Sequence, residues 1–202
     1  DLAAALVLQQ MAGLCFYETQ LVGSFLQDES PDGADRRAEQ AVDYLHRALA
    51  ARPDLATPRE RLAQVLEDQG RLDEAAAAYQ QLLEHAPDHE EAHQWLFAYH
   101  HRREAAERAL EHARRLRELK PLDEYAPVAE HAAHMQLARA QAMAGAWDAA
   151  RAAFDAAAAA YPPCREHPSY LAKRGLMEWK ADNLETADEL LNRVEAHPEP
   201  AP

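Results

Sequence analysis

Apolar side chains recur three and four positions apart along most of this chain, which is the spacing of one face of an α-helix. Residues 41–49, 75–83 and 109–119 each carry such a run, with polar residues at positions between. Each run is followed by a proline that cannot continue a helix, and successive prolines are 34 residues apart. The pattern therefore predicts a helical unit that repeats every 34 residues. The three prolines are Pro53, Pro87 and Pro121.

The most apolar stretch, residues 2–27, also has helical spacing, but it is a poor candidate for a membrane span. Four polar residues interrupt it, namely Gln9, Gln10, Glu18 and Gln20. Apolar side chains occur on more than one side of this predicted helix, so we expect it to pack on more than one side. The residues that follow, 28–35, have the composition of a loop.

Residues 56–89 show the repeating unit most clearly as two helices and a turn. One face of the first helix is formed by Leu62, Ala63 and Leu66. Gly70 breaks this helix, and a second helix is expected over residues 73–84. At the start of the unit, residues 57–60 have the pattern of a capping box with proline at the first helical position.

A 34-residue helix–turn–helix with small residues at these positions resembles the tetratricopeptide repeat family. Ala63 matches the small residue of the family's first helix, Gly70 its turn glycine and Pro87 its terminal proline. Ala75 matches the small residue where the two helices cross, and Tyr79 matches the aromatic residue four positions later. The resemblance covers nearly the whole chain. It implies an all-α fold, a right-handed α-solenoid of about five helix–turn–helix repeats.

The other units keep this pattern with departures. The third unit has Phe97 at the small site and Glu104 at the turn, and the turn of the fifth unit is Asp182-Asn183. Seven residues are inserted before Pro162, and we expect them to lengthen the helix around residues 127–144. The matching positions are Leu96, Ala109 and Leu116 in the third unit, Leu137, Ala138, Gly145, Ala150, Phe154 and Ala157 in the fourth, and Gly175, Ala187, Leu191 and Val194 in the fifth.

We expect a single solenoid domain over residues 1–198, with residues 199–202 as a disordered tail. The expected units are 2–55, 56–89, 90–123, 124–164 and 165–198. Repeat arrays normally need a polar cap at each end, but the fifth unit ends near Ala196 with no further helix predicted. One alternative function is therefore self-assembly, including a homodimer, in which another copy covers a terminal helix.

The resemblance also implies a function, because the first helix of each pair lines a concave groove in this family. We expect a non-catalytic protein–protein interaction scaffold whose groove is acidic in its N-terminal half and apolar in its C-terminal half. Such a groove suits an extended or helical peptide with a basic segment and an apolar anchor. The predicted groove residues are Glu60, Gln64, Glu67, Asp68, Glu91, Gln94, His101, Arg102, Met135, Arg139, Met143 and Trp179.

Plainer interpretations of these positions stay open. The acidic residues could form a solvated face without a partner, and Met135, Met143 and Trp179 could belong to the core or to a cap. One known partner class is disfavoured. Some members of the family hold the C-terminal carboxylate of a chaperone with Lys and Asn, whereas this chain has Glu60 and Gln64 at those positions.

The composition narrows the classes of partner further. The 202 residues include 35 acidic and 21 basic side chains, for a net charge of −14. This balance argues against nucleic acid and anionic membranes, which attract clustered Lys and Arg. Cys15 and Cys164 form no disulfide framework and no redox or metal motif, which favours a cytoplasmic location. The Ala-rich, Lys-poor composition favours a bacterial source.

One short motif has a chemical meaning of its own. Residues 89–93, His-Glu-Glu-Ala-His, match a zinc protease signature in which two imidazoles on one helix face bind the metal and a glutamate acts as the base. The segment also coincides with the start of a repeat, and His93, His100 and His134 fall at inward-facing positions. We therefore predict core histidines, no enzyme activity, no metal and no cofactor. A metal-binding or hydrolytic site through His89, Glu90 and His93 is the remote alternative.

Overall fold

The computed structural model describes residues 2–12 and 31–197, and within these ranges it consists of helices and the turns between them, without a strand. The prediction of an all-α solenoid of helix–turn–helix repeats is confirmed. The chain divides into two compact units, residues 1–99 and 100–202, and each is described by itself. The tail at 199–202 and most of the expected helix at 2–27 lie outside the described residues.

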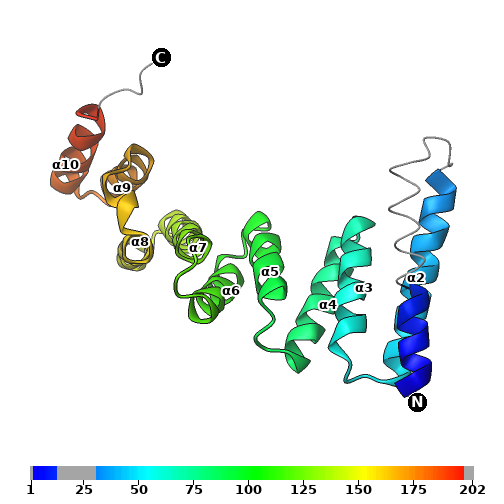
Figure 1. The fold of residues 1–202 in the computed structure, drawn as a ribbon. Coiled ribbons are helices and arrows are strands. Elements are labelled where there is room, and N and C mark those ends of the chain that lie inside the picture. Colours follow the sequence, from blue (N-terminus) through cyan, green and yellow to red (C-terminus); the bar gives the residue numbers. More distant parts are fainter. Residues whose placement is uncertain (1, 13–30, 198–202) are drawn as a thin grey trace. The chain divides into compact units, whose positions relative to one another are not determined.

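Unit 1 contains a helical stretch at residues 2–12 and the helices α2 (Pro31–Ala51), α3 (Ala56–Asp68) and α4 (Leu72–His85). It also contains the start of α5 (Glu90–Arg102), whose last three residues belong to unit 2. Helices α3 and α4 pack side by side (Figure 1). The loop expected at 28–35 is partly wrong, because α2 already begins at Pro31. Proline suits the first position of a helix, where its missing N–H is not needed.

Unit 2 contains α6 (Ala106–Leu119), α7 (Tyr125–Met143), α8 (Trp147–Ala160), a 3₁₀ segment η1 (Pro162–Glu166), α9 (Pro168–Lys180) and α10 (Leu184–Glu195). The helices again pack in pairs, α7 with α8 and α9 with α10 (Figure 1). Helix α7 has 19 residues, whereas the first helix of the second repeat, α3, has 13. This difference confirms that the insertion lengthens α7.

The turn between the paired helices has the same geometry in four repeats. Its central residue has a left-handed backbone, with φ of 71° at Gly70, 58° at Glu104, 73° at Gly145 and 61° at Asp182. The N–H of the next residue donates to a carbonyl five residues earlier, as from Arg71 to Leu66 at 2.9 Å. This bond closes a Schellman motif. The sequence departures at Glu104 and Asp182 therefore change the residue at the turn without changing its backbone.

The predicted capping box at residues 57–60 is wrong. Helix α3 begins two residues earlier than expected, with Leu55 at the N-cap and no side-chain hydrogen bond to the first turn. Thr57 thus lies inside the helix. A side-chain cap occurs instead at α9, where His167 Nδ1 accepts from the N–H of Ser169 at 3.2 Å.

The paired helices approach closely at a small residue. Position four of the second helix is alanine in each pair and is almost wholly buried: Ala75, Ala109, Ala150 and Ala187. On the facing first helix of the fifth repeat, a Cβ added at Gly175 would lie 3.1 Å from two carbon atoms of Leu191. Small residues at these crossings let large side chains, such as Leu82 and Phe154, fill the spaces on either side.

A buried ion pair joins the last two repeats. Glu178 on α9 is almost fully buried, and Arg151 on α8 donates to both of its carboxylate oxygens at 2.9–3.1 Å. Asn183 Nδ2 donates to the same carboxylate at 3.0 Å. Burial by itself raises the pKa of Glu178, but the bonds from Arg151 and Asn183 outweigh burial and hold that pKa below its ordinary value. This carboxylate therefore stays ionised inside unit 2 and ties the two repeats together.

The turn geometry leads to a prediction about stability. Replacing Glu104 by Gly should raise the free energy of unfolding by about 1 kcal/mol, because glycine adopts a left-handed backbone without the steric cost of a side chain. The change also removes an exposed ion pair between Glu104 and Arg139, but such pairs contribute little. Urea denaturation followed by circular dichroism measures the difference.

Gly70→Ala is the matched control for Glu104→Gly. Nothing lies within 4 Å of a Cβ added at Gly70, so this change reports the backbone cost alone. It should lower the free energy of unfolding by about 1 kcal/mol. An unchanged or lower stability of the Glu104→Gly variant would contradict the assignment of strain to this turn.

Candidate functional site

The twelve predicted groove residues lie on the first helices α3, α5, α7 and α9, and each has a partly or fully exposed side chain. Six of them are in unit 1, from Glu60 to Gln94, and six are in unit 2, from His101 to Trp179. That all twelve line one groove stays a prediction. Within each unit, however, the contacts between helices show which of these side chains come together.

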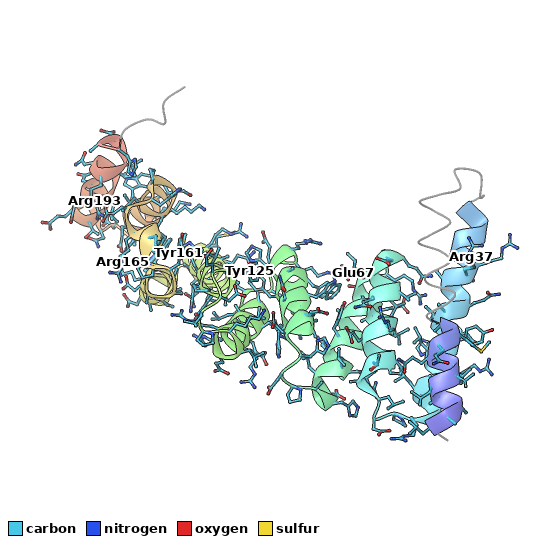
Figure 2. All side chains as sticks on the ribbon, in the orientation of Figure 1. Arg37, Glu67, Tyr125, Tyr161, Arg165 and Arg193 are labelled. Atoms are coloured by element: carbon cyan, nitrogen blue, oxygen red, sulfur yellow. The ribbon has the colours of Figure 1, made fainter. Side chains whose placement is uncertain are left out.

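In unit 1, the negative charges of three of the predicted carboxylates act on one tyrosine hydroxyl. The ring of Tyr79 on α4 is buried. Burial and the negative charges of Glu67, Glu60 and Glu91 raise the pKa of Tyr79, and its hydroxyl is hydrogen-bonded to Glu67. Glu60 and Glu67 come from α3, whose end near Glu67 is labelled in Figure 2, while Glu91 comes from α5. Two first helices thus bring negative charge to the same point.

A row of aromatic rings adjoins these carboxylates. The ring of Tyr79 packs against Trp95 on α5 with centroids 4.7 Å apart, and Trp95 stacks on Tyr99 at 5.3 Å. The Tyr99 hydroxyl donates to Asp73 on α4. Trp95 and Tyr99 are only partly buried and pack at the edge of the unit 1 core. Because Glu91 and Trp95 are one helical turn apart, a carboxylate and an aromatic ring share one side of α5.

We call Glu60, Glu67, Glu91, Tyr79 and Trp95 the acidic–aromatic surface. The sequence predicts its three carboxylates, whereas Tyr79 is expected only as the aromatic residue of the repeat and Trp95 is not among the predicted groove residues. A signal was available, because Trp95 and Tyr99 are four residues apart and follow Glu91 on one helix. Gln64 belongs to the same neighbourhood, since its amide donates to Glu60 at 3.4 Å.

The histidines of the zinc-like motif have structural roles in unit 1. His89 precedes α5, and its Nδ1 accepts from the N–H of Ala92 at 3.3 Å, which is the position of an N-cap. Its Nε2 lies 3.7 Å from Glu60. His93 is inside the helix, with Nε2 2.9 Å from the carbonyl oxygen of Pro87. The two imidazoles therefore do not project from one helix face, as a zinc site through this motif requires. Across residues 2–12 and 31–197, no group of three or more His, Cys, Asp or Glu could hold a metal ion.

Unit 2 buries three further histidines, among them the predicted core residues His100 and His134. His100 and His112 stack in parallel, with ring centroids 5.6 Å apart. His134 has its Nε2 3.8 Å from Glu130, but its Nδ1 has no hydrogen-bond partner among the described residues. Burial lowers the pKa of His100 and of His134, and nearby arginines add to this effect. Both rings are therefore neutral at pH 7.

The predicted groove residues of unit 2 have mixed environments. Met135 packs against the core, whereas Met143 and Trp179 are exposed. Arg139 binds the turn residue Glu104 at 2.5 Å. The backbone carbonyl of His101 accepts a hydrogen bond from Gln136 at 2.8 Å. Exposed apolar side chains therefore occur next to positive charge in this unit.

Each helix within the described ranges is too short or too polar to cross a bilayer.

The buried histidine leads to a prediction about pH. The pKa of His134 is lower in the folded than in the unfolded chain, so the unfolded state binds a proton more readily. Stability should therefore fall as the pH drops below about 6.5. A His134→Leu variant should lose less of its free energy of unfolding between pH 7 and pH 5, as measured by urea denaturation. His197→Leu, at an exposed position, is the control and should keep the original slope. Equal slopes in both variants would contradict this role of His134.

Comparison with known proteins finds two matches to models of the tetratricopeptide repeat, one over residues 34–96 and one over residues 132–163. No curated protein sequence matches the chain. Among solved structures, "MamA 41-end from Desulfovibrio magneticus RS-1" is 18% identical with a TM-score of 0.51, and the match covers 92% of this chain and 94% of that one. MamA AMB-1 is 15% identical with a TM-score of 0.55, and the match covers 100% of this chain and 96% of that one. At these identities the likeness shows a common fold.

Proposed function

Because the chain is a tetratricopeptide repeat protein, we propose that it is a non-catalytic scaffold whose acidic–aromatic surface binds a basic segment of a partner protein. Interaction with other proteins is the general role of this repeat, and its members are typically not enzymes. The observation that carries the more specific proposal is that the negative charges of three carboxylates from α3 and α5 act on the hydroxyl of Tyr79, whose ring packs against Trp95.

The electrostatics favour a cationic partner. A partner cation that binds beside the Tyr79 hydroxyl would be attracted by the charges of Glu67, Glu60 and Glu91 together. The surrounding unit adds to the attraction, because residues 1–99 contain 18 acidic and only 7 basic side chains. Most of the net charge of −14 therefore lies in unit 1. Long-range attraction of this kind raises the rate at which a basic segment associates.

The aromatic rings favour arginine or lysine in that segment. A guanidinium or ammonium group can stack on the exposed part of Trp95 while Glu91 and Glu67 accept its hydrogen bonds. The same carboxylates disfavour a partner's C-terminal carboxylate. Glu60 and Gln64 hold positions where a clamp for such a group needs Lys and Asn, which agrees with the expectation from the sequence.

A defined peptide tests this proposal. A 12-residue peptide of alternating Arg and Ala should bind the full chain, and a Glu/Ala peptide of the same length should not. The double variant Glu67→Lys/Glu91→Lys should weaken binding of the basic peptide by about tenfold or more, since each change replaces attraction with repulsion. Isothermal titration calorimetry at two salt concentrations measures the affinity, which should fall as salt rises.

The control for this experiment is Glu84→Lys/Glu74→Lys. It makes the same change of charge at exposed positions of α4, outside the acidic–aromatic surface. Binding of the Arg/Ala peptide should weaken by no more than about threefold, through the long-range field alone. If both double variants weaken binding equally, the chain attracts the peptide only by its overall charge, and the proposed surface is wrong.

A second candidate function, self-assembly, is favoured by an observation at α10. Leu184 and Leu191 on this helix are 53% and 37% exposed, and within the described residues no later helix packs over them. Association of two copies through α10 would remove these side chains from water.

Light scattering of the full chain tests self-assembly. A species heavier than 22.6 kDa should grow with concentration, and Leu184→Glu, which changes the more exposed of the two side chains, should return the mass to that of the monomer. Leu122→Glu, at a side chain that is almost fully exposed before α7, is the control and should leave the association unchanged. A mass of 22.6 kDa at every concentration would rule out this second function.

A further inference from the structure

The most exposed large apolar side chains on the first helices of unit 2 lie at the end of α7 and on α9. Met143 at the end of α7 is 79% exposed, and Leu176 and Trp179 on α9 are 51% and 58% exposed. Leu176 and Trp179 are three residues apart, so they share one side of α9. The neighbouring residues Gly175, Met177 and Glu178 are buried. Helix α9 therefore has apolar residues on its core side and also on the side that faces solvent, where a surface helix normally carries polar residues.

The two helices that carry these side chains belong to one core. Ala138 of α7 lies in the same buried cluster as Tyr170, Leu171 and Met177 of α9, and Ala142 packs against that cluster. Met143 directly follows Ala142, and Trp179 is two residues after Met177. The helices that carry the exposed apolar side chains thus contribute to one buried cluster. An apolar area that extends from a packed core into solvent is typical of an interaction surface.

The charges beside these side chains are positive. Arg139 is one turn before Met143 on α7, and Lys180 is next to Trp179 and one turn after Leu176 on α9. The single carboxylate on α9, Glu178, is buried and bound by Arg151. The exposed Asp182 and Glu104 sit in turns, and Glu104 is already held by Arg139. In a strongly acidic chain, this surface therefore combines apolar contact area with cationic groups.

From this combination we infer that Met143, Leu176, Trp179, Arg139 and Lys180 form a second docking surface, for a protein segment with a large apolar side chain flanked by carboxylates. The apolar side chain would pack on Trp179 and Leu176, and the carboxylates would pair with Lys180 and, in place of Glu104, with Arg139. The charge of this segment is opposite to that of the segment proposed for unit 1. The inference goes beyond the proposed function and does not depend on the acidic–aromatic surface.

Two synthetic peptides test the surface on the full chain. The first is an acetylated 12-residue peptide with two Leu and one Phe flanked by Glu, and the second has Lys in place of each Glu. The acidic peptide should bind, and the basic one should bind at least tenfold more weakly to this surface. Trp179 fluorescence should shift to shorter wavelength as the ring leaves water. Trp179→Phe should remove that shift while keeping most of the affinity, because an aromatic ring remains in place.

One truncation and one charge reversal on the surface should weaken binding of the acidic peptide. Matched changes elsewhere in unit 2 should leave its affinity nearly unchanged. Trp179→Ala and Lys180→Glu should each reduce its affinity about tenfold, because one removes the aromatic contact and the other reverses a paired charge. Leu122→Ala and Arg165→Glu are the controls and should stay within twofold. Both alter exposed residues of unit 2 outside the surface, and Arg165 is labelled in Figure 2. Circular dichroism verifies that each variant is folded, as expected for exposed positions.

The outcomes separate this inference from the proposed function. The Glu67→Lys/Glu91→Lys variant should still bind the acidic peptide, and Trp179→Ala should still bind the Arg/Ala peptide. Equal affinity for the Glu and Lys versions in the Glu67→Lys/Glu91→Lys variant, in which the acidic–aromatic surface no longer attracts the Lys version, overturns the inference, and so does full affinity for the acidic peptide in both Trp179→Ala and Lys180→Glu. So does a dimer in light scattering that Met143→Ala converts to monomer, because a second copy would then occupy the surface.

Discussion

The close crossing of the two helices in each repeat is the constraint on which the rest of the structure depends. The second helices cross their partners at Ala75, Ala109, Ala150 and Ala187, all almost wholly buried. A larger side chain there would force the helices apart, and the flanking core residues would lose their contacts. The approach is tightest at Gly175, where even a methyl group would come within 3.1 Å of Leu191. The left-handed turn next to each crossing keeps the helices in register, because its hydrogen bond spans a fixed number of residues.

This register also decides which side chains remain available for binding. Once the crossing residues and the large core residues face inward, the opposite sides of α3, α5, α7 and α9 are left at the surface. In unit 1 these sides carry Glu60, Glu67 and Glu91, and in unit 2 they carry Met143, Leu176 and Trp179. The repeat thus supplies equivalent positions, and the residues at those positions give each unit its own chemistry. The two proposed docking surfaces, for segments of opposite charge, therefore need no change of fold.

Polar groups inside the units add specificity to a core that consists largely of alanine and leucine. Arg151 and Asn183 satisfy Glu178 fully, so this buried carboxylate joins α8 to α9 in one arrangement. His93 is bonded to a backbone carbonyl, whereas the equivalent His134 of the next repeat leaves one ring nitrogen without a hydrogen bond. The inserted turn at the start of α7 accounts for this difference between His93 and His134, because it changes the backbone that precedes His134. Unit 2 is therefore the part of the chain whose folded structure we expect acid to destabilise first.

The amino-acid sequence by itself determined the helix pairs, the small residues at their crossings, the positions of the turns and the carboxylates of α3 and α5. These features follow from offsets within one repeat, and a pattern at fixed spacing is readable without a structure. Only the tertiary structure decided that the charges of those carboxylates act on Tyr79 and that Trp95 packs on the Tyr79 ring. It also decided that His89 caps a helix instead of facing His93, and that Glu178 pairs with Arg151, 27 residues away. Each of these depends on how one helix packs on another, and local periodicity does not specify which side chains meet across that contact. Glu104 and Asp182 show the same limit, because the packing of the flanking helices imposes a left-handed turn that their residue types do not prefer.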